Sequence, residues 1–142
     1  MYKTILIPID LDQESSWQRA LPIAVEYSQI FGSRLHAATV LPDLGSGVVG
    51  SYFPPDFEEK AGAEARDKLE ALVREKVPSN IDVTCHVVHG TAYEEILCLA
   101  DDIGADLIVM ASHRPELKDY LIGPNAARVV RHAKVSVLVV RG

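Results

Sequence analysis

Cysteine is scarce in this sequence, and the spacing of the two that occur does not suggest a disulfide or a cysteine-based metal site. The 142 residues contain two cysteines, Cys85 and Cys98, which show neither CxxC spacing nor a neighbouring histidine pair. Both lie inside expected secondary-structure elements, so we expect buried free thiols rather than a disulfide or a metal site. Spacing typical of metal ligands is also missing among the histidines His36, His86, His89 and His132.

Long apolar runs and clusters of basic residues are also missing. No run approaches the roughly 18 residues that a membrane span needs, and the start MYKTILIPID has no features of a signal peptide. These absences predict a cytoplasmic protein with no membrane partner. The formal net charge is -6 without any Lys/Arg cluster, so nucleic acid is not an expected partner. A single nucleotide needs only a few aimed backbone N–H groups and is not excluded.

The composition is that of an ordinary globular domain. Apolar residues make up 48% of the chain and charged residues 24%, which suggests neither disorder nor a fibrous repeat. The length is near the commonest domain size, and we expect one domain over residues 1–142.

Apolar runs and helical periodicities alternate along the chain. Gly32 and Gly104 supply helix stops, and Pro22 inside the first helix is expected to kink it or to free a carbonyl. The segment 42–57, rich in Gly, Ser and Pro, is expected to be a long, mobile surface loop. The expected strands cover 3–9, 34–41, 81–90, 105–112 and 135–140, and the expected helices cover 17–31, 58–77, 92–103 and 124–133.

This alternation predicts the α/β class with a five-stranded open parallel sheet. The first, fourth and fifth strands are apolar on both faces, which indicates that helices cover both sides. Right-handed crossovers then favour the strand order 3-2-1-4-5. In such sheets ligands bind where the strand order reverses, here between the carboxyl ends of the first and fourth strands. Asp10 and the stretch Ala111 to His113 therefore meet in one crevice.

The stretch ASHRPELKDYLIGPNA at 111–126 allows two interpretations. It is either a loop that cradles phosphate or an ordinary connection from a strand to a helix. Gly123 and Pro124 are then either part of an anion site or a turn and the first turn of a helix. Asp10 either contacts a ligand or caps the first helix.

Over its whole length the chain resembles the universal stress protein family. The resemblance rests on KTILIPID at the start, ADLIVMASH at the fourth strand and LIGPNAARVVRHAKVSVLVVRG at the end. It implies a Rossmann-like fold of the adenine nucleotide alpha hydrolase type that binds ATP, with or without Mg²⁺, or ADP or AMP, as a regulatory module with little or no hydrolysis. It implies that Asp10 and the Val40 backbone contact adenosine and that the 111–126 loop contacts the phosphates. The full set of implied nucleotide-binding residues is Pro8, Ile9, Asp10, Val40, Met110, Ala111, Ser112, His113, Arg114, Gly123, Pro124 and Asn125.

The 111–126 loop departs from the family's G-x-x-G-x9-G-(S/T) pattern. Ala111 and Arg114 replace the first two glycines, the count to Gly123 is one residue short, and Pro124 replaces the hydroxyl residue. Some family members carry a shorter form beginning S-H-R-P, so Pro124 is the more serious change. It removes an N–H and a hydroxyl donor, each worth roughly 1.5 to 3 kcal/mol toward a charged group.

Three other functions compete with nucleotide binding. A phosphoacceptor receiver domain is rejected, because the chain lacks an acidic pair directly after the first strand, an Asp ending the third and a Lys after the fifth. An enzyme that hydrolyses ATP slowly is the weaker hypothesis, because no triad or metal spacing accompanies Ser112, His113 and Asp119. A homodimeric scaffold that has lost its nucleotide is the third.

The last strand is expected to lie at an edge of the sheet. The expected strand Val135 to Val140 is long and apolar for an edge strand, and the sequence shows no segment that would cover its free edge. Such an edge favours pairing with a second copy about a two-fold axis. We expect a homodimer through this strand.

Overall fold

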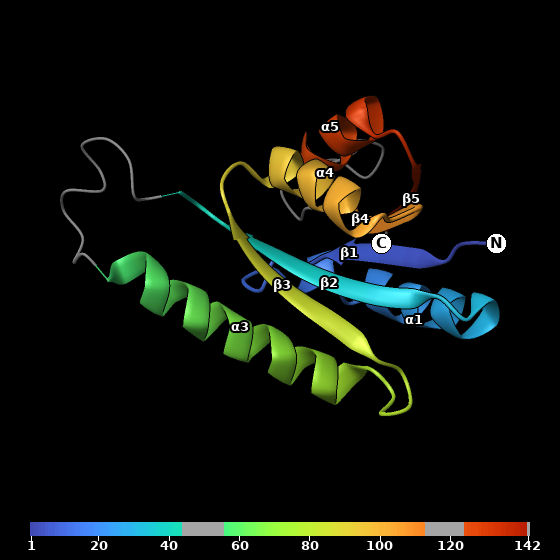
Figure 1. Ribbon diagram of the computed structural model, residues 1–142, viewed down its shortest axis with the longest axis horizontal. Coiled ribbons are helices and arrows are strands. Elements are labelled where there is room, and N and C mark those ends of the chain that lie inside the picture. The colour runs from blue at the N-terminus through green and yellow to red at the C-terminus, as the bar shows by residue number, and fades with distance from the viewer. Residues whose placement is uncertain (44–55, 113–123, 142) are drawn as a thin grey trace.

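The fold is a twisted parallel sheet between two layers of helices (Figure 1). A computed structural model describes residues 1–43, 56–112 and 124–141. Its five strands lie in the order β3-β2-β1-β4-β5, and every neighbouring pair is parallel. The strands are β1 Thr4–Pro8, β2 Arg34–Leu41, β3 Val83–His89, β4 Leu107–Ala111 and β5 Ser136–Val140. The predicted fold class and strand order are confirmed.

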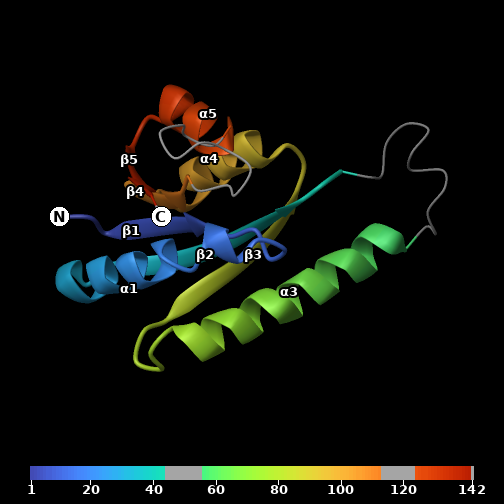
Figure 2. The same ribbon diagram turned by 180° about the vertical axis from the view of Figure 1, so that it is seen from behind.

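Helices cover both faces of the sheet, as the views from the front and from behind agree (Figures 1 and 2). One face carries α1 and α3, and the other carries α4 and α5. A short 3-10 helix, η1, follows β1. The helices are η1 Glu14–Ser16, α1 Ala20–Phe31, α3 Phe57–Lys76, α4 Ala92–Ile103 and α5 Pro124–His132.

Side-chain alternation along β1 explains why two cores form. Ile5 and Ile7 belong to the cluster under α1 and α3, whereas Leu6 belongs to the cluster under α4 and α5. All three are 0% exposed, since β1 is the central strand and is covered on both faces. Each fully buried side chain of this size contributes about 1.5–3 kcal/mol, so β1 anchors both layers.

The beginning of the first helix differs from the prediction. The chain from Trp17 was expected to be helical, but α1 begins at Ala20, and η1 and a turn occupy the preceding residues. Pro22 is consequently the third helical residue, where an N–H has no partner within the helix. The loop 42–57 lies mostly outside the described residues, which resume at Asp56 just before α3.

The prediction that both cysteines are buried is wrong. Both thiols are free, but Cys85 is half-buried and Cys98 is exposed. Cys98 lies on α4, whose buried residues are Ile96, Leu99 and Ala100, so helical periodicity turns Cys98 outward. Burial raises the pKa of the Cys85 thiol, and the nearby Glu70 carboxylate adds to this rise.

Glycines end two of the helices as predicted. Gly32 after α1 and Gly104 after α4 adopt left-handed φ values of 66° and 67°, the conformation that glycine adopts without strain. Within the described part of the chain, no helix combines the length and apolar character required to cross a membrane.

Candidate functional site

A crevice opens at the carboxyl edge of the sheet, where the strand order reverses. β1 and β4 pair only through Ile5 with Leu107 and Leu6 with Ile108, so their last residues separate. The cavity between them has a volume of about 230 Å³. Its lining consists of Pro8, Ile9, Asp10, Gln13, Ser15, Ser16, Ala38, Val40, Ala92, Ile96, Met110, Ala111, Ser112, Asn125 and Ala126.

Main-chain groups of β2 face this crevice because β1 is shorter than β2. The ladder between them ends at Pro8 and Ala38, and Ile9 N donates to Ala38 O at 2.7 Å. In a parallel ladder, alternate residues direct both N–H and C=O to the same neighbouring strand. The N–H and C=O of Val40 therefore point to the side of β1, where β1 has already ended. This places one donor and one acceptor side by side at the crevice.

Asp10 terminates β1 and forms a tight turn instead of capping a helix. Its Oδ1 accepts from the N–H of Asp12 at 3.0 Å, and its carbonyl accepts from the N–H of Gln13 at 3.0 Å. The N-cap positions of η1 and α1 belong to Gln13 and Arg19, so the helix-cap interpretation of Asp10 is wrong. Asp10 Oδ2 accepts no hydrogen bond from the described residues and is exposed at the crevice.

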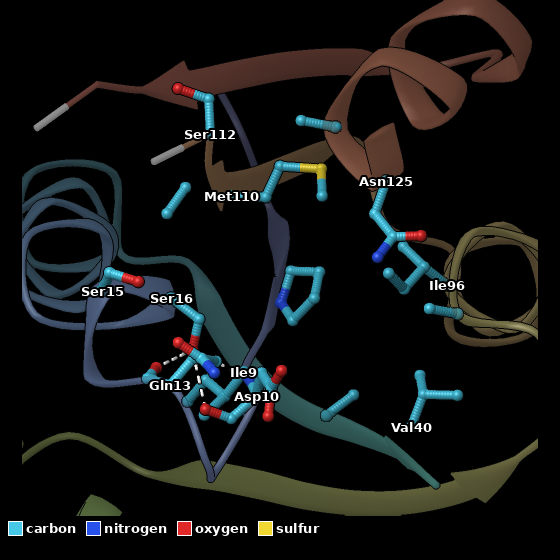
Figure 3. A pocket seen from close by; sticks show the side chains of 15 residues that line it. Ile9, Asp10, Gln13, Ser15, Ser16, Val40, Ile96, Met110, Ser112 and Asn125 are labelled. Carbon is cyan, nitrogen blue, oxygen red and sulfur yellow. Dashed lines mark hydrogen bonds between the residues drawn. The ribbon is translucent and has the colours of Figure 1, made fainter. Parts of the chain in front are cut away.

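The turn at η1 adds polar residues that sequence reasoning missed. Ser16 Oγ accepts from the N–H of Asp10 at 2.9 Å, and its hydroxyl lies 2.7 Å from the carbonyl of Gln13. These bonds fix the orientation of the Asp10 turn, as Figure 3 shows. Ser15 and Gln13 line the same end of the cavity. In the sequence, the polar run LDQESS after β1 indicated only the start of a helix. The same run contains Gln13, Ser15 and Ser16, so it also marked polar residues beside the crevice.

The N-terminus of α5 forms the wall opposite the Asp10 turn. The helix begins at Pro124, and Asn125 and Ala126 line the crevice. The first N–H groups of a helix have no partners within it, and the helix dipole makes this end electropositive. Pro124 contributes no N–H, so Asn125 and Ala126 supply the first available donors. Figure 3 shows the Asn125 side chain directed toward the cavity.

Apolar side chains form the remaining part of the lining. Three of them are Val40 on β2, Ile96 on α4 and Met110 on β4. They face the cavity from the side opposite Asp10 and the η1 turn (Figure 3). Ala38 and Ala92 are small and leave room between these walls. Such a slot suits a flat, largely apolar ring, which would lie beside the main-chain N–H and C=O of Val40.

The structure brings together most of the residues predicted from the sequence. Asp10 and the end of β4 lie at one crevice although about 100 residues separate them in the chain. Pro124 begins α5 but is not among the lining residues, and His113, Arg114 and Gly123 lie outside the described residues. The predicted residues that line the crevice are Pro8, Ile9, Asp10, Val40, Met110, Ala111, Ser112 and Asn125.

The chemistry of the crevice favours binding. The described residues contain no group of three His, Cys, Asp or Glu side chains that could hold a metal ion. Side chains with clearly shifted pKa values, where the structure describes them, lie away from the crevice lining: His36, Cys85, His86 and Asp106. Hydrogen-bond donors and acceptors at fixed positions beside apolar walls are typical of a ligand site.

Comparison with known proteins gives a consistent result. The profile of the universal stress protein family matches residues 1–141. Universal stress protein G of Escherichia coli O157:H7 is 35% identical over 145 residues, which cover 99% of this chain and 100% of that protein.

Two solved structures share the fold over nearly the whole chain. The structure of MJ0577, a universal stress protein of Methanocaldococcus jannaschii, has a TM-score of 0.75 at 28% identity. The match covers 100% of this chain and 97% of the MJ0577 chain. A universal stress protein solved in complex with cAMP has a TM-score of 0.63 at 26% identity, covering 99% of this chain and 97% of its own.

Proposed function

The chain belongs to the universal stress protein family, and on this premise we propose that it binds an adenine nucleotide in the crevice as a regulatory module. The observation that carries the proposal is the N–H and C=O of Val40, which lie beside the Asp10 turn and have no ladder partner on β1 among the described residues. Adenine presents an adjacent acceptor and donor along one edge, which such a main-chain pair matches. The cAMP complex of a relative supports the same ligand class.

Each part of the crevice suits one part of a nucleotide. The slot of Val40, Ile96 and Met110 accepts the base, and Asp10 Oδ2 accepts hydrogen bonds from ribose hydroxyls. The amides of Asn125 and Ala126 face the phosphates at the positive end of α5. The cavity of about 230 Å³ lies below the roughly 300 Å³ of typical drug-sized sites. It therefore suits the nucleoside, with the phosphates extending toward α5.

We propose ATP as the nucleotide, with Mg²⁺ held by its phosphates. Mg²⁺ keeps several water ligands and binds substrate phosphates, and Asp10, the carboxylate among the described lining residues, faces the ribose instead. Hydrolysis needs a positioned base for water, and the described part of the lining has no histidine and no carboxylate besides Asp10, which the ribose occupies. Turnover at this site is therefore slow or absent.

Calorimetric titration of the protein with ATP and Mg²⁺, ADP, AMP and cAMP tests the proposal. Asp10→Asn keeps the acceptor for Asp12 N–H but removes the charged acceptor, so affinity should fall about tenfold or more. Val40→Pro should also weaken binding, because it removes the free N–H while leaving the ladder to β3 intact. Asp12→Asn is the matched control, since Asp12 adjoins the turn but is not a lining residue.

Three results would count against the proposal. Absence of binding to every adenine nucleotide would favour the nucleotide-free scaffold. Equal affinities for the wild type and Asp10→Asn would place the ligand elsewhere. Steady release of phosphate above background would favour the slow ATPase. Circular dichroism of each variant checks that the fold is retained.

We also propose that the protein is a homodimer through β5. Among the described strands β5 pairs only with β4, and its Val137, Leu138 and Val139 stay half-buried. Because Val140 O accepts from Ser112 N, alternation directs the N–H of Val139 to the free edge. Val139→Pro should therefore convert the dimer to a monomer without breaking the ladder to β4. Light scattering coupled to gel filtration measures this, and a wild-type monomer at micromolar concentration would contradict it.

A further inference from the structure

Two helices on the same side of the sheet carry opposite charges. α4, with the sequence AYEEILCLADDI, contains four acidic residues and neither Lys nor Arg. The segment PNAARVVRHAK, which consists of α5 and the two residues after it, contains three Lys or Arg residues and neither Asp nor Glu. The helices pack side by side over one core (Figure 1), and the ring of Tyr93 on α4 stacks on that of His132 on α5 with centroids 6.0 Å apart. Their outer surfaces therefore form one face with an acidic half and a basic half.

The acidic half is a stripe along α4 that consists of Glu94, Cys98, Asp101 and Asp102. All four residues are exposed, and their spacing of four and then three or four residues places them on one side of the helix. Asp101 and Asp102 lie at the C-terminal end of α4, where the helix dipole disfavours negative charge. The ion pairs that join described residues lie along α3 or at its N-cap, and none of them involves this acidic stripe. Two carboxylates in an unfavourable position, without a described cation, indicate a partner that supplies one.

The basic half is a stripe along α5 that consists of Ala127, Val130, Arg131 and Lys134. These residues are exposed at steps of three or four. Val130 is 46% exposed and is among the few large apolar side chains that are exposed in the described part of the chain. An apolar centre beside charged groups is the usual composition of a protein interface. Neither stripe contributes to the crevice lining, so nucleotide binding does not explain them.

The two stripes are arranged so that a second copy of the chain can cover both at once. Each of the two helices begins near the carboxyl edge of the parallel sheet, so both run back toward the amino edge. A two-fold axis between the helices, along this common direction, lays the basic stripe of each copy on the acidic stripe of the other. Arg131 and Lys134, which end the basic stripe, then lie opposite Asp101 and Asp102, which end the acidic stripe. Such a self-complementary contact forms each charge pair twice.

We propose that the acidic stripe and the basic stripe together form a self-association surface whose partner is a second copy of this chain. The charge pairs orient the two copies, and Val130 loses its exposure to solvent in the contact. Because charge complementarity contributes orientation and association rate more than affinity, the association is weak and depends on salt. The surface lies on the helical layer and not at the edge of β5. A homodimer formed through β5 therefore associates further, into tetramers.

Sedimentation equilibrium of the full chain at rising protein concentration tests the surface. At an ionic strength of about 0.01 M, where charges act over about 30 Å, we expect the average mass to double beyond that of the smallest species. At about 1 M, where the screening length is about 3 Å, this doubling should require at least about tenfold more protein.

Charge reversal identifies the contact. Arg131→Glu and Asp101→Arg should each weaken the association at least about tenfold, because each variant meets its own copy with like charges at both contacts. An equimolar mixture of the two variants should associate as the wild type does, because both contacts in the mixed pair then join opposite charges. Arg74→Glu on α3 and Glu26→Arg on α1 are the matched controls, since they make the same changes of charge at exposed positions of the opposite helical layer.

Three results would overturn the proposal. The first is an average mass that stays constant at low ionic strength up to millimolar protein. The second is a mixture that associates no better than the separate variants. The third is an association that survives both reversals and disappears in Val139→Pro, which would assign it to the edge of β5 alone. Circular dichroism checks the fold, and Arg131→Asp or Asp101→Lys replaces a variant that does not fold.

Discussion

The crevice and the His36–His86 pair offer polar groups by different means. In the crevice the polar groups of the sheet belong to the main chain, and no described strand pairs with them because β1 ends at Pro8 while β2 continues to Leu41. At the histidine pair, formed by His36 on β2 and His86 on β3, the ladder between the two strands is continuous, and the polar groups are side chains in diagonal register whose Nδ1 and Nε2 atoms lie 2.9 Å apart. The first region is specified by where strands end, and the second by how two continuous strands align.

This difference determines how each region responds to substitution. A main-chain donor keeps its place when most side chains around it change, so the crevice tolerates sequence variation at Val40. A pair of imidazoles is lost with either side chain.

Pro124→Ser should strengthen nucleotide binding in the crevice and leave the histidine pair unchanged. The serine restores an N–H and adds a hydroxyl at the first turn of α5, so nucleotide affinity should rise about ten- to a hundredfold. Titration calorimetry measures the gain. Pro78→Ser, which replaces an exposed proline after α3, is the matched control. An unchanged affinity would show that phosphates do not reach the start of α5.

Gly90→Ala should disturb the crevice while sparing the histidine pair. Gly90 lies between β3 and α4 with φ of 143°, and an added Cβ would come within 2.7 Å of the Glu95 carboxylate. We expect the free energy of unfolding to fall by about 1–3 kcal/mol, with weaker nucleotide binding because α4 carries Ala92 and Ile96. Urea denaturation measures the loss.

Two further variants separate the causes of that loss. Glu95→Ala combined with Gly90→Ala removes the contact but retains the backbone strain, so part of the stability should return. Gly104→Ala is the control, because Gly104 has φ of 67° and no atom within 4 Å of the added Cβ. Its cost should be smaller, about 1–2 kcal/mol. Equal losses for Gly90→Ala and Gly104→Ala would mean that the Glu95 contact contributes nothing.

The histidine pair should make stability fall mildly on acidification. Burial first, and then nearby positive charge, lowers the pKa values of His36 and His86 in the folded protein. The unfolded chain, with histidine pKa near about 6.5, therefore takes up protons at higher pH than the folded chain does. The contribution of the pair is fully present above about pH 6.5 and is lost as pH falls through the lower folded values.

Urea denaturation between about pH 7.5 and 5, with EDTA present, measures this dependence. The slope should be at most about 1.4 kcal/mol per pH unit for each histidine. The double variant His36→Gln/His86→Gln should show a flatter slope in this range. An identical slope in the double variant and the wild type would show that His36 and His86 do not cause the loss of stability at low pH.

Much of the fold and part of the crevice were predictable from local patterns. Apolar runs at the sites of β1 and β4 indicated a parallel sheet covered on both faces, and the topology then placed Asp10 beside the end of β4. The start of α1 was not predictable. The spacing of apolar residues from Trp17 onward is that of a helix, but in the structure η1 and a turn occupy the residues before Ala20. The burial of Cys98 was mispredicted because an apolar residue type does not reveal which side of α4 faces the core.

The sequence by itself determined the order of the elements, since hydrophobic periodicity and the glycine stops at 32 and 104 act over a few neighbouring residues. Only the tertiary structure decided that the Val40 main chain extends past the end of β1, because that depends on β1 ending before β2 in the assembled sheet. It also decided that His36 meets His86, because the register of two strands is set by packing across the whole sheet. Spacing along the chain carries no record of such a register, and for this reason the pair has no signature in the sequence.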